Sequence, residues 1–586
     1  MKPEQVAAKL PLETYEENFA DLNPLLTPQQ ALIAASRCLY CFDAPCIKAC
    51  PTRIDVPSFI KKISTGNLTG SARVILTANI LGESCGRVCP TEVLCEGACV
   101  LNGTGERPVE IGRLQRYAAD FALSRELSPL RAGTPNGLRV ACIGSGPASL
   151  ACAAELAQRG YSVEIFDRNP VPGGLNTYGI AAYKSRAEDS RREVKLVENL
   201  GVKIHQGVQV TGVAAEACRA PLASDDLSGT EAGAAAPERS RISLAEIEAG
   251  FDAVFIGVGL GETWDLRLPG EDLRGVKGAM EFIERTKSRP FAEVDVGRRV
   301  AVIGAGNTAI DVVTAARRLG AESVSMIYRR GEDSMPAFAY EYDLAKQDGV
   351  NFMWNTQPLA ILGHDGAVTG LECARTRLEG RGRFARVEIE PGSNFTLAVD
   401  MIIKALGQQP VTEFLASIPG IELKEGHVVV DPATHQTGTP KYFAGGDCVN
   451  GGKEVVDAVA EGMAAARGID VWLAQESTVD SKEVGTGISK RERVSAMQFM
   501  VSERFRNRDA KAVYRRLRDR GRSQPEGLKY IGSWIEANFD RCFQLMECDD
   551  ARLLQRWIAA WSDLVEFEIV PVVASAEVRE AIEPLL

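Results

Sequence analysis

The stretch that decides the fold runs from Leu138 to Ser149 and reads LRVACIGSGPAS. A short apolar strand enters a Gly-x-Gly loop, and an Ala- and Leu-rich helix follows as far as Gly160. The next strand, Ser162 to Phe166, ends at an acid, Asp167, about twenty positions past the loop. Glycines in such a loop let the backbone approach a pyrophosphate at the helix N-terminus, and the acid binds ribose hydroxyls. The pattern predicts a Rossmann-type dinucleotide-binding unit.

The same pattern returns at Arg299 to Ala309, where the strand RVAVI enters the loop GAGNTA. Here the following strand, Ser323 to Tyr328, ends in Arg329 and Arg330 instead of an acid. Guanidinium groups attract the 2′-phosphate of NADPH, which a carboxylate would repel, so this second site favours NADPH over NADH. Two such loops predict two dinucleotides in one chain.

Eight of the fifteen cysteines lie in front of both loops, in two groups that run from Cys38 to Cys50 and from Cys85 to Cys99. Short groups of thiolates at these spacings suit iron–sulfur clusters, because each cubane takes about four ligands. By analogy with two-cluster ferredoxins, Cys50 would cross to the second cluster and Cys99 would return to the first. Structural zinc is the main alternative, but zinc moves no electrons and the rest of the chain has redox patterns.

The composition is that of a protein with ordinary hydrophobic cores, since 45% of its 586 residues are hydrophobic and 25% are charged. A net charge of −11 argues against nucleic acid or an anionic membrane as the main partner. No apolar run approaches the roughly eighteen residues of a membrane helix, and the N-terminus is too acidic for a targeting peptide. The sequence predicts a cytoplasmic location, where disulfides are not expected.

Two further motifs accompany the first loop, namely Gly173-Gly174-Leu175 and the strand that closes in Gly445-Gly446-Asp447. They resemble the FAD-binding halves of two-dinucleotide flavoprotein reductases, in which the Asp contacts the ribityl-phosphate region and the nicotinamide domain is inserted into the FAD domain. The resemblance implies FAD on residues 121–290 and 401–476, and NAD(P)H on residues 291–400. The implied FAD-binding residues are Gly144, Gly146, Pro147, Ala148, Asp167, Gly173, Gly174, Leu175, Gly446 and Asp447, and those for NAD(P)H are Gly304, Gly306, Asn307, Thr308, Ala309, Arg329 and Arg330.

With the cysteine region in front, residues 30–475 closely resemble the NAD(P)H-oxidising part of dihydropyrimidine dehydrogenase and are similar to the small subunit of glutamate synthase. The motifs are CLYCFDAPC from Cys38, CGRVCP from Cys85, CEGAC from Cys95, and Leu114-Gln115. In dihydropyrimidine dehydrogenase the matching Gln is a cluster ligand and the Cys that matches Cys85 is not, whereas spacing alone would choose Cys85. The resemblance implies Cys38, Cys41, Cys46 and Cys99 on one cluster, and Cys50, Cys89, Cys95 and Gln115 on the other.

Two stretches depart from these relatives. A basic residue that follows the first strand-end arginine in the relatives has no counterpart in residues 331–336, so the nucleotide is NADPH or NADH. The Ala/Ser/Asp-rich insertion at residues 218–240 has no periodicity, which predicts a loop without chemistry.

A separate unit is predicted at residues 496–586, after a polar linker at 477–495. Its apolar pattern gives the order strand, helix, strand, strand, helix, strand, which fits a ferredoxin-like sandwich with Trp534 and Trp557 in its core. It contains none of the four histidines, so neither metal binding nor catalysis is expected there. It resembles small proteins that pair through their sheets, which implies homodimerisation or docking.

The sequence thus predicts an α/β protein: a helical domain with two 4Fe–4S clusters at residues 1–120, two Rossmann-like domains, and a C-terminal α+β ferredoxin-like domain. The expected activity is oxidation of NAD(P)H, with hydride passed to FAD and single electrons leaving through the clusters. No catalytic acid or nucleophile is needed. The acceptor is expected on a separate subunit with an FMN barrel that reduces uracil or thymine. The alternatives are a glutamate-synthase-type small subunit that feeds another acceptor, and a non-enzymatic flavin or zinc assembly module.

Overall fold

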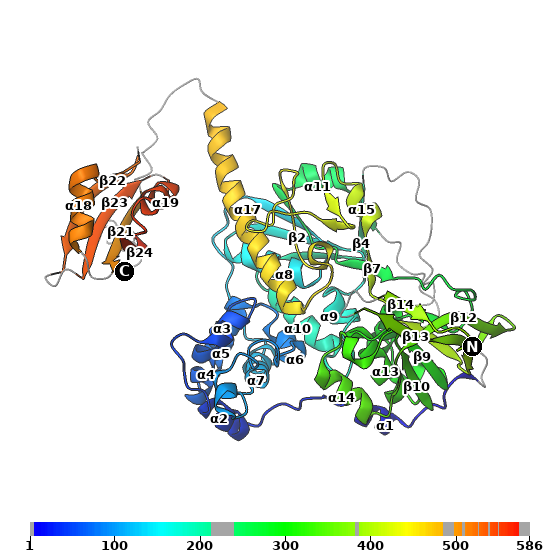
Figure 1. The fold of residues 1–586 in the computed structure, drawn as a ribbon. Helices are drawn as coiled ribbons and strands as arrows, with labels where there is room; N and C mark the ends of the chain where they lie inside the picture. The colour runs from blue at the N-terminus through cyan, green and yellow to red at the C-terminus, as the bar shows by residue number, and fades with distance from the viewer. Residues whose placement is uncertain are drawn as a thin grey trace. The chain divides into compact units, whose positions relative to one another are not determined.

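The computed structural model describes residues 5–212, 240–380, 386–483, 497–506, 510–525, 527–536, 540–548 and 550–573. The chain forms two compact units, residues 1–483 and 484–586 (Figure 1). Nearly all of the predicted insertion at 218–240 lies outside the described residues. In the part of the chain that is described, no helix is both long and apolar enough to span a bilayer.

The cysteine region is helical, as predicted. Helix α2 begins at a capping box, in which Gln30 N donates to Thr27 Oγ1 and Thr27 N donates to Gln30 Oε1. Helices α4, α5 and α7 share one apolar core, and the cysteines pack against its edge. The elements are α2 (Pro28–Ser36), α3 (Pro45–Ala49), α4 (Val56–Ser64), α5 (Leu68–Ala78), α6 (Gly82–Val88), a 3-10 turn (Val100–Thr104) and α7 (Ile111–Leu123).

Residues 5–19, predicted as the start of this helical domain, instead pack on the second dinucleotide-binding sheet. Ala7 N donates to Val296 O, and the ring of Phe19, at the end of α1 (Leu12–Asn18), stacks on Phe291 with 4.0 Å between centroids. Tyr15 is buried in the same core. This packing could not be read from the sequence, because the partners of the two aromatic side chains lie far away along the chain.

The first dinucleotide-binding sheet is parallel, with the order β20-β6-β1-β2-β3. Helix α17, yellow in Figure 1, lies along α8 on this sheet. The strands are β1 (Arg139–Ile143), β2 (Ser162–Asp167), β3 (Lys203–Gln206), β6 (Ala253–Ile256) and β20 (Tyr442–Ala444); the helices are α8 (Pro147–Gln158), α9 (Leu175–Tyr178), α10 (Ala187–Glu198), α11 (Leu244–Gly250), α16 (Asp447–Asn450) and α17 (Val455–Glu483); β4 (Val208–Thr211) pairs with β5 (Ser240–Ser243).

The second sheet is also parallel and has the order β11-β10-β9-β16-β8. Its strands all fall between β6 and β20 in the sequence, which confirms that one Rossmann-like domain is inserted in the other. The strands are β8 (Val276–Gly278), β9 (Arg299–Ile303), β10 (Ser323–Ile327), β11 (Asn351–Met353) and β16 (Met401–Lys404), with helices α12 (Ala279–Ser288), α13 (Asn307–Arg318) and α14 (Ala339–Gln347).

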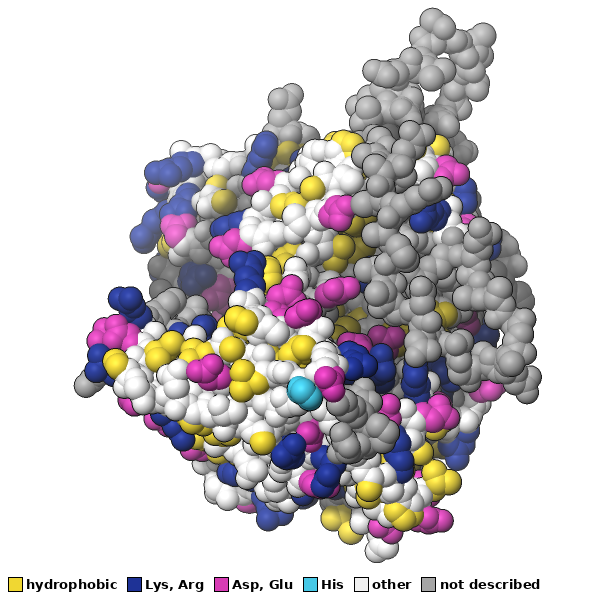
Figure 2. Space-filling model, turned by 90° about the vertical axis from the view of Figure 1, so that its right-hand side faces the viewer, with side chains coloured by type: hydrophobic (Ala, Val, Ile, Leu, Met, Phe, Trp, Pro, Cys, Tyr) yellow, Lys and Arg dark blue, Asp and Glu magenta, His cyan; other side chains and the backbone are white. Residues whose placement is uncertain are grey.

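Smaller elements complete this part of the molecule. They are the antiparallel sheet of β12 (Thr356–His364), β13 (Ala367–Glu379), β14 (Arg386–Ile389) and β15 (Phe395–Leu397), the pair β7 (Leu260–Thr263) and β17 (Gln408–Pro410), the pair β18 (Leu423–Lys424) and β19 (His427–Val428), helix α15 (Thr412–Ala416), and 3-10 turns at Phe291–Glu293 and Glu332–Ser334. On the face shown in Figure 2, the described acidic and basic side chains are interspersed, as on an ordinary solvated surface.

Two predicted boundaries differ from the structure. The second sheet extends beyond residues 291–400 at both ends, because β8 and β16 pair in it. Helix α17 continues to Glu483, so residues 477–483 of the predicted linker are helical. No Gly or Pro occurs there before Gly485, so the backbone continues the helix although the sequence turns polar.

The C-terminal unit has the antiparallel strand order β22-β23-β21-β24, which is the ferredoxin-like arrangement predicted from the sequence. Its elements are β21 (Met497–Phe505), α18 (Ala510–Arg520), β22 (Lys529–Ile535), β23 (Arg541–Cys548), α19 (Arg552–Ala559) and β24 (Val565–Val572). Trp557 is buried in its core, but Trp534, expected there too, is 59% exposed. Trp534 pairs with Phe543, and the buried neighbours Cys542 and Gln544 alternate to the other face of β23.

Candidate cofactor sites

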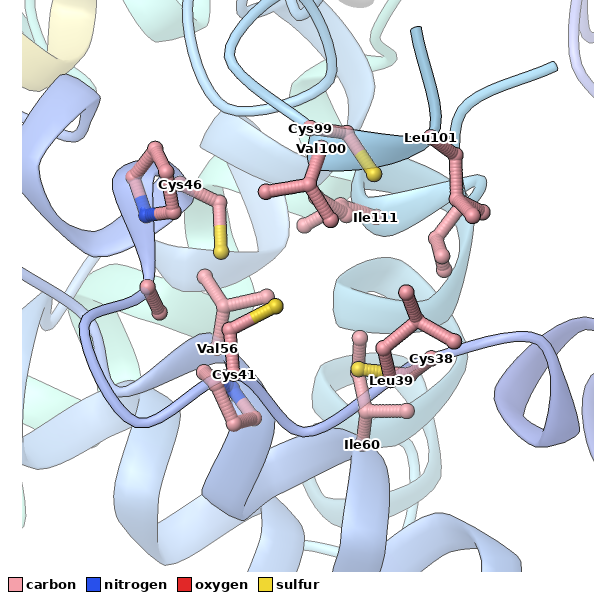
Figure 3. Close-up of a pocket in the computed structure, with 14 residues that line it drawn as sticks. Cys38, Leu39, Cys41, Cys46, Val56, Ile60, Cys99, Val100, Leu101 and Ile111 are labelled. Atoms are coloured by element: carbon pink, nitrogen blue, oxygen red, sulfur yellow. The ribbon is translucent and has the colours of Figure 1, made fainter. Parts of the chain in front are cut away.

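Four cysteines surround one cavity in the helical region. Figure 3 shows the sulfur atoms of Cys38, Cys41, Cys46 and Cys99 directed into a shared space, whose apolar wall includes Val56, Ile60, Leu101 and Ile111. Burial raises the pKa of Cys46 to about 11 and also raises that of Cys38. Because metal ligation needs thiolates, binding at this site would release protons. The structure thus brings together all four residues predicted for the first cluster.

A second cavity lies beside it and is lined by Cys50, Cys89 and Cys95, together with both Cys85 and Gln115. Gln115 Nε2 donates to Gly82 O at 2.9 Å, which leaves Oε1 as the free end of the amide. Cys85 Sγ accepts a hydrogen bond from Asn79 Nδ2 at 3.2 Å. Its hydrogen bond with Cys89, and burial, raise the pKa of Cys89 well above the usual range. Each of the predicted ligands of the second cluster therefore lies at this cavity.

Both cavities fit a cluster of several irons better than a single ion. Among the described residues, no three His, Cys, Asp or Glu side chains meet closely enough to hold one metal ion. A zinc ion needs its sulfur ligands about 2.3 Å away, so the four sulfur atoms must pack closely around one atom. The cysteines of the first cavity instead surround a space, as Figure 3 shows, and those of the second line a cavity as well, which is the arrangement that a cubane requires.

The first dinucleotide loop has the geometry of a pyrophosphate cradle. Gly144 has φ +91°, and a Cβ there would lie 2.5 Å from Gly257 O, so only glycine fits. Gly146 is the N-cap of α8 and has no side chain to cap the first N–H groups. No described atom lies within 4 Å of a Cβ built on Gly146, so the space in front of Pro147 and Ala148 is open to a phosphate.

Asp167 fixes this loop from inside. Its Oδ2 accepts hydrogen bonds from Ser145 N at 2.7 Å and Ser145 Oγ at 2.6 Å, and Oδ1 accepts one from Asn169 N at 2.7 Å. Gly173 N in turn donates to Ser145 Oγ at 3.1 Å. The predicted ribose contact of Asp167 is thus accompanied by a structural role. Ser145 was not among the predicted residues, although its place between the two glycines could have indicated it.

The other two predicted FAD motifs meet at the same loop. A Cβ on Gly174 would lie 2.7 Å from Gly146 Cα, so Gly173, Gly174 and Leu175 pack against the cradle. Gly446 N donates to Glu461 Oε2 at 2.7 Å, and a Cβ on Gly446 would lie 3.0 Å from Ala148 Cβ. Asp447 therefore starts α16 beside the N-terminus of α8, and burial raises its pKa. Glu461 was missed, because its contact with Gly446 depends on how α17 packs.

The second loop repeats the first. Gly304 has φ +130° and a Cβ there would overlap Ala405 O, whereas a Cβ on Gly306 would meet no described atom within 4 Å. Asn307, Thr308 and Ala309 form the first turn of α13. Arg329 and Arg330 follow β10, and their carbonyl oxygens accept hydrogen bonds from Thr376 Oγ1 and Asn355 N. The side chain of Arg329 is exposed, where a nucleotide phosphate could reach it.

Three family descriptions match this chain. They are dihydropyrimidine dehydrogenase domain II, 4Fe-4S cluster, over residues 15–127, pyridine nucleotide-disulphide oxidoreductase over residues 138–462, and a domain of unknown function (DUF3303) over residues 497–586. The fold and these sites define an iron–sulfur flavoprotein oxidoreductase that uses NAD(P)H. The chain binds FAD, NADPH or NADH, and two 4Fe–4S clusters, as the sequence predicted, which leaves the assembly-module alternative without support.

Comparison with individual proteins shows the family to which the chain belongs. The chain is 35% identical over 485 residues to the glutamate synthase (NADPH) small chain of Escherichia coli (strain K12), covering 79% of this chain and 96% of that protein. It is 32% identical over 461 residues to an NAD-dependent dihydropyrimidine dehydrogenase subunit PreT homolog of Salmonella typhi, covering 78% and 98%. FprA from Mycobacterium tuberculosis in complex with NADPH aligns with a TM-score of 0.44 and 19% identity over 60% of this chain and 87% of that chain. This chain belongs to the family of glutamate synthase small chains and PreT-type dihydropyrimidine dehydrogenase subunits.

Proposed function

We propose that this chain is the electron-input subunit of a larger enzyme in which a partner with an FMN barrel reduces a pyrimidine such as uracil or thymine. Bound FAD supplies the step between hydride and single electrons, and the two clusters conduct those electrons. The chain's own residues bind the nucleotide, hold the cofactors and exclude water. The observation that carries the proposal is a shared wall between the FAD part and the second cysteine cavity.

That wall is formed by Val456, in the first turn of α17, which lines the cavity of Cys50, Cys89 and Cys95. Helix α17 follows the Gly446-Asp447 motif closely, so the FAD part and this cavity are neighbours. The two cavities are neighbours as well, since Cys46 of the first lies in the short helix α3 and Cys50 of the second is the C-cap of that helix. This arrangement supports electron flow from FAD to the second cluster and then to the first.

The lining of the two cavities supports a choice of ligands for each cluster. We assign Cys38, Cys41, Cys46 and Cys99 to the first cluster, and Cys50, Cys89, Cys95 and Gln115 to the second. Gln115 is held by Gly82 through its nitrogen, so its oxygen can act as a ligand, whereas Cys85 is 2% exposed and accepts a hydrogen bond from Asn79. Purified without oxygen, the chain should hold about eight irons and one FAD. Replacing Cys46 by Ser should empty the first site and spare FAD.

The partner is proposed to bind beside the first cavity. Leu39 and Val100 line that cavity and are also exposed, and the neighbouring Phe42 is 103% exposed. Exposed large apolar side chains beside a redox site are typical of a protein interface. Both relatives are named as one chain of a larger enzyme, which also supports a partner subunit. The location proposed for the chain is the cytoplasm, a reducing compartment in which the cysteine ligands of the clusters stay out of disulfides.

A second candidate acceptor is a glutamate synthase large chain, because the chain is 35% identical to a glutamate synthase small chain. The test separates the two. The pure chain is mixed with NADPH or NADH without oxygen, and nucleotide oxidation is followed with a one-electron dye, with uracil, and with glutamine plus 2-oxoglutarate. Each substrate is then tested again with the matching partner subunit added. We expect turnover with the dye alone and with uracil only when the barrel subunit is present.

Dihydrouracil formed by this chain alone would contradict the two-subunit proposal. Turnover only with the glutamate synthase large chain would keep the electron-input role and replace the pyrimidine by 2-oxoglutarate and glutamine. Absence of nucleotide oxidation with the dye, in protein that retains iron and FAD, would contradict the electron-input role itself.

A further inference from the structure

A buried charged cluster joins the two dinucleotide-binding sheets. Lys184, in the segment between α9 and α10, forms ion pairs with Asp311 on α13 at 2.6 Å and with Glu341 on α14 at 2.5 Å. Tyr183 OH donates to Asp311 Oδ1 at 3.0 Å. The segment that follows the Gly173-Gly174 motif of the FAD part is thus held by helices of the NAD(P) part.

One atom of this cluster has no donor. Glu341 Oε1 accepts from Lys184 Nζ and from Tyr340 OH at 3.3 Å, but Oε2 is buried and receives no hydrogen bond from any described residue. Glu341 as a whole is 4% exposed. Burying a carboxylate oxygen without a donor is unfavourable, so this atom points to a donor on a ligand.

The position of Glu341 identifies which ligand that is. On one side, Phe338 N donates to Asn307 Oδ1 at 3.1 Å, so the start of α14 lies over the N-terminus of α13 at the second dinucleotide loop. On the other side, burial and then the charge of Glu341 raise the pKa of Glu454 to about 7. Glu454 stands directly before α17, close to Asp447. Glu341 therefore lies between the pyrophosphate cradle for NAD(P)H and the FAD-binding motif.

A nucleotide whose pyrophosphate binds at Asn307 must place its nicotinamide ring in this region, because the ring has to reach the flavin. The carboxamide is the one substituent of that ring with N–H donors. We propose that Glu341 Oε2 accepts a hydrogen bond from the carboxamide NH2 of the nicotinamide, and that Lys184 and Tyr340 hold the carboxylate in place for it. This contact fixes the rotation of the ring and so decides which face is presented to FAD. The inference rests on the proposed function, since it requires that this chain bind NAD(P)H.

The test removes the hydrogen-bond donor from the ligand and the acceptor from the protein. The ligands are NADP⁺ and 3-acetylpyridine adenine dinucleotide phosphate, in which a methyl ketone replaces the carboxamide, or the corresponding NAD⁺ pair if the wild type binds it more tightly. Dissociation constants are measured by titration calorimetry on the oxidised, FAD- and iron-loaded full chain. The wild type should bind the nicotinamide nucleotide roughly tenfold more tightly than the ketone. Glu341→Ala should bring this ratio close to one.

A matched control is available on the same helix. Asp343 is exposed and pairs with Lys346, so Asp343→Ala should keep the wild-type ratio. FAD and iron contents report whether each variant folds; if Glu341→Ala loses them, Glu341→Gln decides, because its neutral amide should lower the ratio by roughly threefold. An unchanged ratio in the variant that folds would overturn the inference. A wild type that binds neither nucleotide would contradict the proposed function instead.

Discussion

The two dinucleotide loops of this chain share one backbone and differ in the side chains around it. In each, the first glycine, Gly144 or Gly304, has positive φ, and a Cβ there would overlap a carbonyl oxygen just past a neighbouring strand. A Cβ on the second glycine, Gly146 or Gly306, would face open space. The first loop is then tied to an acid through Ser145 and Asp167, whereas the second has Ala305 and is followed by Arg329. Backbone geometry thus supplies a pyrophosphate site in both, and the flanking side chains choose the nucleotide.

The largest effect on stability and FAD binding is expected from substitutions of the two glycines within one loop. Gly144→Ala forces a side chain into a positive-φ position and against Gly257 O, so it should cost more than about 2 kcal/mol of folding free energy and abolish FAD binding. Gly146 has φ −70°, and a Cβ there would meet no described atom within 4 Å, so Gly146→Ala should leave the stability of the FAD-free protein unchanged. It should weaken FAD binding, because the methyl group takes the space of the phosphate.

Thermal unfolding of FAD-stripped protein and FAD content after desalting distinguish these outcomes. The same pair in the second loop, Gly304→Ala and Gly306→Ala, should act on NADP⁺ binding in the same way and leave FAD in place. Full FAD affinity in Gly146→Ala would show that the pyrophosphate does not lie at this helix N-terminus.

The next effect sharpens the difference between the loops. Arg329→Ala should raise KM for NADPH about tenfold or more and leave KM for NADH nearly unchanged, because a charge-assisted hydrogen bond to phosphate is lost. The measurement is dye reduction with each nucleotide. Arg377→Ala is the matched control, since Arg377 is an exposed arginine of the same domain that pairs with Glu388. Equal effects of Arg329→Ala on both nucleotides would show that this arginine does not contact the 2′-phosphate.

A smaller effect is expected when the first loop is given the sequence of the second. Ser145→Ala makes it Gly-Ala-Gly and removes the hydroxyl between Gly173 N and Asp167. Loss of about 1 kcal/mol should weaken FAD binding roughly fivefold. Titration of the FAD-free protein measures this, with Ser162→Ala, an exposed residue at the start of β2, as the control. Unchanged affinity would mean that Asp167 and Ser145 do not shape the FAD site.

The smallest effect on either loop should come from the C-terminal unit. We propose that the full chain dimerises through the sheet face that carries Trp534 and Val570, which are 59% and 47% exposed. Trp534→Ser should shift the mass measured by light scattering from dimer to monomer and leave the affinities for FAD and NADP⁺ unchanged. A wild type that is monomeric at micromolar concentration would refute this pairing.

Much of the fold could be predicted because its signals are local. The loop at Gly144 and Gly146 lies between a strand and a helix that are both predicted by their apolar patterns. The capping box at Thr27 involves residues within four positions of each other. The four strands of the C-terminal unit follow from the alternation of apolar and polar residues, and its two helices follow from helical periodicity. The strand that carries Trp534 was predicted, but the burial of Trp534 in the core was not found. The sequence of one strand does not tell which of its faces the helices of the unit will cover.

The sequence by itself determined the classes of cofactor. The glycines that bind a phosphate, and the cysteines that bind iron, lie close together in the sequence, so their spacing is visible without the fold. Only the tertiary structure decided what lies beside these segments: Val456 at the second cysteine cavity, Glu461 at Gly446, and α1 on the second sheet. The physical reason is that such contacts join residues far apart in the chain. Lys184, Asp311 and Glu341 come from three elements, and only folding brings their charges within ion-pair distance and leaves one carboxylate oxygen for a ligand.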